Sequence, residues 1–218
     1  MCFSPEADLV GGLVISAAGI DALRHAGPQP ARLALGALPL LLGLHQLTEA
    51  FVWWGLRGDV PGSWTAPATW AYLLVAFVVL PPYVPLVVRA LEPRGLRRHA
   101  MTAFAVIGTA VSAVLLAALL RGPVRARLGD HHIAYTTGLP AEIPVTAAYV
   151  AATCGAALFS RHRPIVVFGA VNLVAVAVIA YLTLDGFASI WCAWAAVASL
   201  LIAAYLRRTA SRPSLAPA

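Results

Sequence analysis

Two residues inside one long apolar stretch of the sequence could carry chemistry. His45 and Glu49 lie in the run from Leu41 to Trp54, which is otherwise apolar enough to belong to a membrane span. Because they are four residues apart, they share one face of a helix. Ionisable side chains are expensive inside a bilayer, so their presence there indicates a functional site.

Together with residues elsewhere in the chain, this pair could bind a transition metal. Two histidines and a carboxylate form the facial triad that holds Fe(II), or a catalytic Zn site with one open position. The expected ligands are His45, Glu49, and either His132 or its neighbour His131. A thiolate from Cys2 or Cys192 would shift the preference toward Zn or Cu.

A metal in this place would support hydrolytic chemistry. The ion lowers the pKa of a bound water and so produces a nucleophile. Tyr135 or Asp185 could then serve as acid or base.

The same polar residues also have a purely structural interpretation. His45 and Glu49 could hydrogen-bond to each other or to a neighbouring helix and hold the bundle together. Taken alone, His131 and His132 are typical of a solvated loop, and Cys192 is typical of a small packed side chain. Both interpretations remain open from the residues alone.

The elements that must position these residues are transmembrane helices. Of the 218 residues, 61% are hydrophobic and only 11% are charged, and the mean hydropathy is +0.82. A soluble domain of this size needs far more surface charge. We therefore expect an all-α, polytopic membrane bundle of seven helices, with spans at about Leu9–Leu23, Leu33–Leu56, Ala66–Leu91, Met101–Leu120, Ile143–Phe159, Pro164–Leu182 and Gly186–Tyr205.

The arginines divide unequally between the loops and set the orientation. Of the fifteen, eleven follow the first, third, fifth and seventh spans, and four lie on the other side, at positions 57, 121, 125 and 127. The positive-inside rule then places the N-terminus outside and the C-terminus in the cytoplasm. In short loops these arginines are topology signals, so we expect the lipid bilayer as the main partner and no nucleic acid.

This topology gathers dispersed polar residues at the outer end of the bundle. Glu49 lies ~12 Å below that end at 1.5 Å per residue. Ser4, Glu6 and Asp8 begin the chain there, and the outer loop 122–142 begins and ends there. Within that loop, β-branched and aromatic residues between Gly129 and Gly138 predict a short extended or hairpin segment. We expect it to fold over the helix ends.

Two further features concern the organisation of the chain. Residues 1–208 are expected to form a single transmembrane domain, and residues 209–218 a disordered cytoplasmic tail rich in Ser, Pro and Ala. Pro81 and Pro82 predict a bend in the third span, since each removes an amide donor and its ring clashes with the preceding turn.

Several segments carry a resemblance to a known group of proteins. The opening Met1-Cys2-Phe3-Ser4, the stretch from Leu40 to Trp54, the loop from Gly129 to Tyr135 and the run from Leu184 to Ala196 together resemble an uncharacterised bacterial seven-span family whose members begin Met-Cys-Phe-Ser. The resemblance covers nearly the whole chain. It implies a multi-pass protein of the bacterial plasma membrane and implies no activity.

Three hypotheses for function follow. The first is an outward-facing polar pocket that binds Zn, Cu or Fe, in its sharper form a metal-dependent enzyme acting on a lipid or small apolar substrate. The second is a transporter or receptor in which Glu49 and His45 relay a proton or ligand. The third is an accessory subunit of a larger membrane complex.

Overall fold

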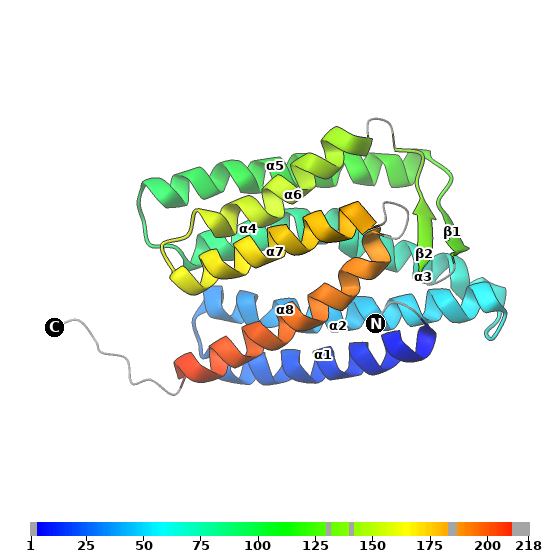
Figure 1. Ribbon diagram of the computed structural model, residues 1–218, viewed down its shortest axis with the longest axis horizontal. Helices are drawn as coiled ribbons and strands as arrows, with labels where there is room; N and C mark the ends of the chain where they lie inside the picture. The colour runs from blue at the N-terminus through cyan, green and yellow to red at the C-terminus, as the bar shows by residue number, and fades with distance from the viewer. Residues whose placement is uncertain (1–3, 130–131, 140–141, 183–186, 211–218) are drawn as a thin grey trace.

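The computed structural model describes residues 4–129, 132–139, 142–182 and 187–210, with the backbone alone described at 179–180, 182 and 187–193. In these ranges the backbone is mostly helical (Figure 1). The elements in chain order are α1 (Pro5–Ala26), α2 (Pro30–Arg57), the 3-10 turn η1 (Gly62–Trp64), α3 (Thr65–Leu73), the π-helical segment η2 (Leu74–Val79), α4 (Leu80–Leu91), α5 (Leu96–Arg121), β1 (Arg125–Leu128), β2 (Ile133–Thr136), α6 (Glu142–Leu158), α7 (Arg163–Leu182) and α8 (Phe187–Ala210).

Helices lie at all seven of the predicted positions. The third position is filled by α3, η2 and α4 in succession. The predicted all-helical class is therefore confirmed. Within the described ranges, three stretches are long and apolar enough to cross a membrane: Pro30–Arg57, Gly62–Leu91 and Leu96–Arg121.

Local sequence sets where the first two helices begin and end. The Ser4 hydroxyl caps α1 by accepting a hydrogen bond from the Ala7 amide at 3.2 Å, and Pro5 occupies the first helical position. Pro30 begins α2 in the same way. At the other end, Gly58 adopts a left-handed conformation (φ 84°), which stops the helix at almost no steric cost.

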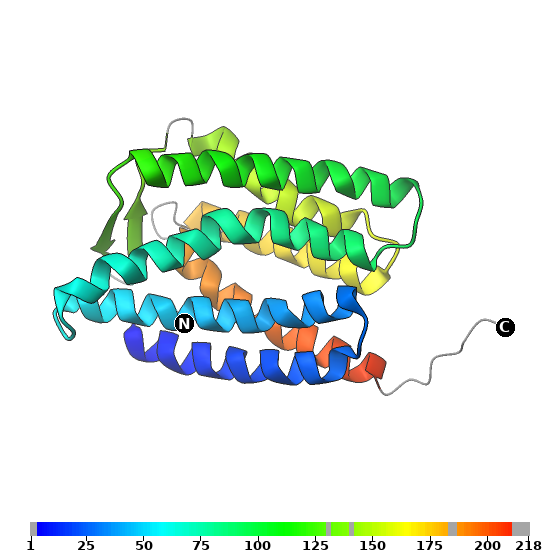
Figure 2. The ribbon, with the colours of Figure 1, turned by 180° about the vertical axis from the view of Figure 1, so that it is seen from behind.

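The helices form two layers that run along the long axis of the molecule. α6, α7 and α8 cover one face of a layer made by α1, α2, α4 and α5 (Figures 1 and 2). The largest buried apolar cluster joins α1, α2, α4 and α8, and its members include Ile15, Leu42, Leu80 and Leu206. The β1–β2 hairpin lies at the end where α1 begins and α2 ends.

The third helical stretch changes direction in its middle, as the two prolines predict (Figure 2). The π-helical segment η2 comes directly before Pro81 and Pro82. Pro82 has no amide to donate to the Val78 carbonyl, and the Ser112 hydroxyl of α5 donates to that carbonyl instead, at 2.7 Å. The Tyr149 hydroxyl of α6 donates to the Ala76 carbonyl at 2.9 Å. Neighbouring helices thus satisfy carbonyls that the distorted helix exposes.

The last helix continues slightly beyond the predicted domain end. Thr209 and Ala210, expected in the tail, complete α8. The Thr209 hydroxyl accepts a hydrogen bond from Arg32 at 2.9 Å, which links the end of α8 to the start of α2. Residues 211–218, the rest of the predicted tail, lie outside the described residues.

Close contact between α5 and the bent segment depends on Gly108. A Cβ at this position would overlap the carbonyl of Pro81. A backbone carbonyl cannot rotate out of the way as a flexible side chain can. We therefore expect Gly108→Ala to destabilise the protein by about 1–3 kcal/mol, as overpacking does. Thermal unfolding in detergent would measure this.

Gly62→Ala is the matched control for that variant. No heavy atom lies within 4 Å of the carbon that this substitution adds, so the unfolding temperature should stay close to that of the wild type. Equal unfolding temperatures for the two variants would contradict the proposed contact.

Candidate functional site

Close packing between α1 and α2 forms the floor of the site. A Cβ at Gly43 of α2 would collide with Ser16 of α1, and a Cβ at Gly12 of α1 would lie 2.7 Å from the Leu47 side chain. Two glycines on facing surfaces therefore let the helix axes approach closely. The first turn of α1 is thereby held against the middle of α2.

This approach buries an acidic residue against an amide. Asp8 is fully buried, and its Oδ1 accepts a hydrogen bond from Gln46 Nε2 at 3.2 Å. Gln46 is itself only 1% exposed. A carboxylate and an amide inside this otherwise apolar helix pair form the first part of a polar cluster, whose second part lies on the adjacent face of α2.

The second part is a closed chain of contacts through four side chains. The rings of His45 and Tyr72 stack, with centroids 4.0 Å apart and planes 16° apart. Tyr72 stacks in turn on Tyr135, at 4.8 Å and 17°. The Tyr135 hydroxyl donates to Glu49 Oε1 at 3.4 Å, and Glu49 returns the chain to α2 one turn beyond His45. Glu49 is fully buried and His45 is 6% exposed.

The hairpin supplies the residue that closes this chain. β1 and β2 pair antiparallel, with Ala126 opposite Tyr135 and Leu128 opposite Ile133. Ile133 is fully buried against Val52 and Trp53 of α2. Since residues two apart point to the same side of a strand, burial of Ile133 also directs Tyr135 toward the bundle. The predicted hairpin over the helix ends is therefore present.

Two charged residues, Arg57 and Glu6, lie where α2 ends and α1 begins. Arg57 Nη1 lies 3.9 Å from Glu6 Oε1, and its guanidinium stands over the Trp53 ring at 5.2 Å from the centroid. Hydrogen bonds from the Glu6 backbone and the Ser4 side chain lower the pKa of the Glu6 carboxyl, and Arg57 lowers it further. An ionised, exposed Glu6 thus stands two residues before the buried Asp8.

Buried polar atoms without a hydrogen-bond partner concentrate in the same region. Within the described part of the chain they include Ser16 Oγ, His45 Nδ1, Gln46 Oε1 and Trp53 Nε1. All four come from α1 or α2. Such atoms are rare in proteins, and each calls for an explanation such as a functional role or a bound water or ion. Their concentration in one region marks the cluster as the candidate site.

The structure brings together some of the site residues predicted from sequence and places another elsewhere. His45, Glu49 and Tyr135 come together as described. His132 is placed at the hairpin turn, where its ring lies against Gly129 and its carbonyl accepts from the Gly129 amide at 2.8 Å. The remaining candidates lie outside the described residues or side chains: Cys2, His131, Asp185 and Cys192.

Only some of the predicted metal ligands lie among the described side chains. No three His, Cys, Asp or Glu side chains in the described ranges come together as a group that could hold an ion. His45 and Glu49 remain on one helix face, which is the part of the predicted set that sequence spacing alone determines.

Sequence reasoning missed two members of the cluster, Gln46 and Tyr72, and did not select Asp8. Gln46 is a polar residue within the same apolar stretch, so a signal was present. Tyr72 had a weaker signal, because a tyrosine in an apolar helix is common, and only the fold places it between His45 and Tyr135.

Tyr135 should control how tightly the hairpin is held. Tyr135→Ala removes both the stack on Tyr72 and the bond to Glu49, so trypsin should cleave after Arg125 or Arg127 at least roughly tenfold faster, given the strength of aromatic pairs. Tyr135→Phe keeps the stack and should give a smaller increase. Cleavage of the folded protein in detergent would measure both.

Thr136→Ala is the control, since Thr136 is the exposed neighbour on the same strand. Its cleavage rate should match that of the wild type. If Tyr135→Ala is cleaved no faster than this control, the hairpin is held by other contacts.

Comparison with known proteins places the chain in a family. Residues 1–217 match the family of unknown function DUF6629, so the chain belongs to that family. No curated protein and no solved structure matches the chain.

Proposed function

We propose that this DUF6629 member is a seven-helix plasma-membrane protein of bacteria that binds and releases a proton at Glu49, as part of a transporter or receptor. In this proposal the N-terminus is outside and the C-terminus is in the cytoplasm. Three described stretches long enough to cross a membrane support it, as does the division of the arginines between the two ends.

The observation that carries the proton-binding role is the burial of Glu49 in contact with a phenol from a different element. Glu49 is fully buried on an apolar helix, and it accepts a hydrogen bond from Tyr135. A charged carboxylate in such a place is costly. A second fully buried acid, Asp8, belongs to the same cluster. We infer that the cluster holds at least one exchangeable proton.

The partners of Glu49 suit a group that changes its protonation state. A phenolic hydroxyl can donate a hydrogen bond to a carboxylate or accept one from a carboxylic acid. The contact between Tyr135 and Glu49 can therefore persist, in altered form, in both states. The imidazole of His45, one turn away, is a further group able to take up or pass on a proton.

The proposal links this proton to movement at the outer face. Tyr135 belongs to the hairpin, so a change in its bond with Glu49 acts on a segment that covers the helix ends. Uptake of a proton at Glu49 would thereby alter access to the cluster from outside. Such coupling is what a proton-linked transporter or a receptor requires.

A metal centre is the second candidate. It is favoured by His45 Nδ1, which is buried and has no hydrogen-bond partner among the described residues, one turn from Glu49. His45 and Glu49 would hold Zn, Cu or Fe, with further ligands from Cys2, His131, His132 or Cys192. Such an ion would supply an activated water for hydrolysis of a lipid or small apolar substrate, with Tyr135 or Asp185 as acid or base.

The proposed orientation predicts the location of the C-terminus. A green fluorescent protein fused after Arg208 should fluoresce, because that end is expected in the cytoplasm. Alkaline phosphatase fused at the same place should be inactive. The opposite pair of results would reverse the bundle and move the polar cluster to the cytoplasmic side.

Glu49→Gln should remove the exchangeable proton while nearly preserving size and hydrogen bonding. In the wild type, infrared spectra recorded across a pH range should contain a carboxylic-acid band that changes with pH, and this band should be lost in Glu49→Gln. Proton flux into vesicles containing the purified protein, followed with a pH-sensitive dye, should fall in parallel.

Glu142→Gln is the matched control, since Glu142 is exposed at the start of α6 and the substitution changes the same charge. It should leave the infrared band and the flux unchanged. Metal analysis of the same preparations separates the two candidates. Stoichiometric Zn, Cu or Fe that is lost in both Glu49→Gln and His132→Ala would support the metal centre and rule out the proton site.

A further inference from the structure

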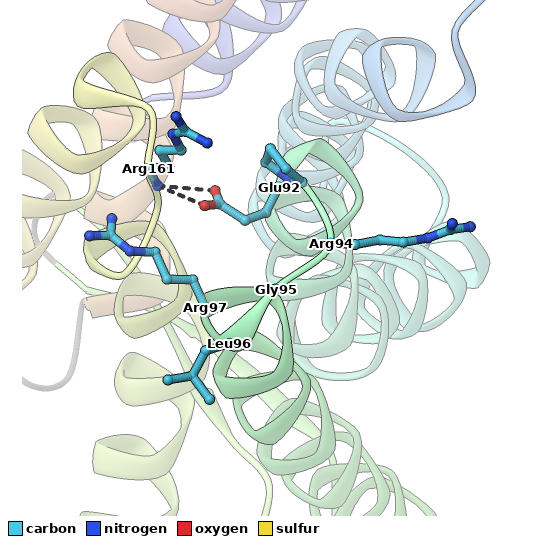
Figure 3. A pocket seen from close by; sticks show the side chains of 7 residues that line it. Glu92, Arg94, Gly95, Leu96, Arg97 and Arg161 are labelled. Carbon is cyan, nitrogen blue, oxygen red and sulfur yellow. Dashed lines mark hydrogen bonds between the residues drawn. The ribbon is translucent and has the colours of Figure 1, made fainter.

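We propose that a cavity at the opposite end of the bundle binds the phosphate group of an anionic membrane lipid. The cavity has a volume of about 320 Å³, within the range of small-molecule sites. It lies where the loop between α4 and α5 meets the loop between α6 and α7 (Figure 3). Its lining residues are Glu92, Pro93, Arg94, Gly95, Leu96, Arg97 and Arg161. The inference rests on the proposed membrane architecture and is independent of the role of Glu49.

The acidic residue in this lining makes its hydrogen bonds to a backbone amide and a serine hydroxyl, not to a guanidinium group. Glu92 is 3% exposed, and both of its carboxylate oxygens lie 3.0 Å from the backbone nitrogen of Arg161. Its Oε2 also accepts from the Ser160 hydroxyl at 3.0 Å. Figure 3 shows the Glu92 carboxylate directed at the Arg161 backbone. Among the described contacts, no ion pair joins Glu92 to a guanidinium group of the cavity, and the lining of three arginines and one glutamate carries a net positive charge.

Hydrogen bonds between the two loops hold the backbone of the cavity together, and one of them also holds the Arg97 side chain. Arg97 Nη1 donates to the Ser160 carbonyl at 3.3 Å, and His162 Nε2 lies 3.3 Å from the Leu91 carbonyl. Together with the contacts of Glu92, they join segments about 70 residues apart in sequence. The backbone of such a site loses little conformational freedom when a ligand binds.

The chemistry of the lining fits a phosphodiester. Guanidinium groups match phosphate oxygens in geometry and can form two parallel hydrogen bonds with them. Arg97 and Arg161 extend on one side of Glu92 and Arg94 on the other (Figure 3), which suits a headgroup with several oxygens better than one small anion.

An exposed apolar side chain points to a lipid as the source of the phosphate. Leu96 is 88% exposed although it lies between Arg94 and Arg97. Charged and apolar groups side by side at a helix end are the pattern of a membrane interface, where a headgroup and its acyl chain are both within reach. Cationic residues on the cytoplasmic side of membrane proteins meet a leaflet that carries anionic lipids.

The test is a lipid titration of the full-length protein in nonionic detergent, followed by native mass spectrometry. Phosphatidylglycerol should bind saturably and more tightly than phosphatidylcholine with the same acyl chains. The double variant Arg94→Gln with Arg161→Gln should weaken this binding roughly fivefold for each arginine. The Arg161 backbone amide that binds Glu92 is retained in that variant.

The matched control is Arg125→Gln with Arg127→Gln, which removes the same charge from exposed positions in the hairpin at the other end. It should bind phosphatidylglycerol as the wild type does. A second variant, the single substitution Arg94→Glu, should also weaken the binding of phosphatidylglycerol. Equal binding by the cavity and hairpin double variants would overturn the proposal.

A third arm identifies the source of the phosphate. Inorganic phosphate should not displace phosphatidylglycerol. If it does, and if the cavity variant loses phosphate binding, the lipid assignment is overturned and the ligand is a soluble phosphate. Because Glu49 plays no part in these measurements, their failure leaves the infrared test of Glu49 untouched, and failure of that test leaves the lipid result untouched.

Discussion

The contact between Glu49 and Tyr135 is the constraint on which the hairpin end of this structure depends. An ionisable group on an apolar helix needs a polar partner, because neither lipid nor an apolar core can replace water. The partner here comes from the hairpin between α5 and α6. A short two-stranded segment that would be marginal by itself is thereby joined to α2 and α3. The need of the Glu49 carboxylate for a polar partner thus helps to position a hairpin whose Tyr135 is 86 residues away in sequence.

The same requirement shapes the bend in the third helical stretch. Pro81 and Pro82 leave carbonyls without their usual amide donors, and the π-helical segment spreads the disturbance over the preceding turn. Ser112 and Tyr149 donate to two of these carbonyls from α5 and α6. The distorted segment is thereby hydrogen-bonded to two neighbouring helices, and Gly108 allows α5 to come close enough for its part of this contact. In both places a polar group that cannot remain unsatisfied decides which elements are neighbours.

Much of the fold could be predicted from sequence, since apolar runs of ~20 residues and turn residues between glycines depend on local composition. The grouping of His45 with Glu49 followed from helical spacing, and Tyr135 followed from the topology. Tyr72 could not be placed, because its position between His45 and Tyr135 depends on how α3 packs in the bundle, which local sequence does not determine. His132 depended on the register of the hairpin, which turns its ring toward Gly129. The metal-ligand hypothesis relied on that second histidine, and among the described residues no group of three possible ligands comes together.

Two buried glutamates in one chain illustrate how partners separate a structural carboxylate from one suited to change. Glu92 contacts a backbone amide and a serine hydroxyl, and with them it fastens two loops together. Both of its oxygens lie 3.0 Å from that amide nitrogen. Glu49 meets a phenol and lies one turn from an imidazole, and both of those groups can donate or accept. Both glutamates are buried, so burial alone does not distinguish a structural carboxylate from one that exchanges a proton. We propose the proton for Glu49 because its contact with Tyr135 can persist in both protonation states, and a fastening role for Glu92 because it joins two loops.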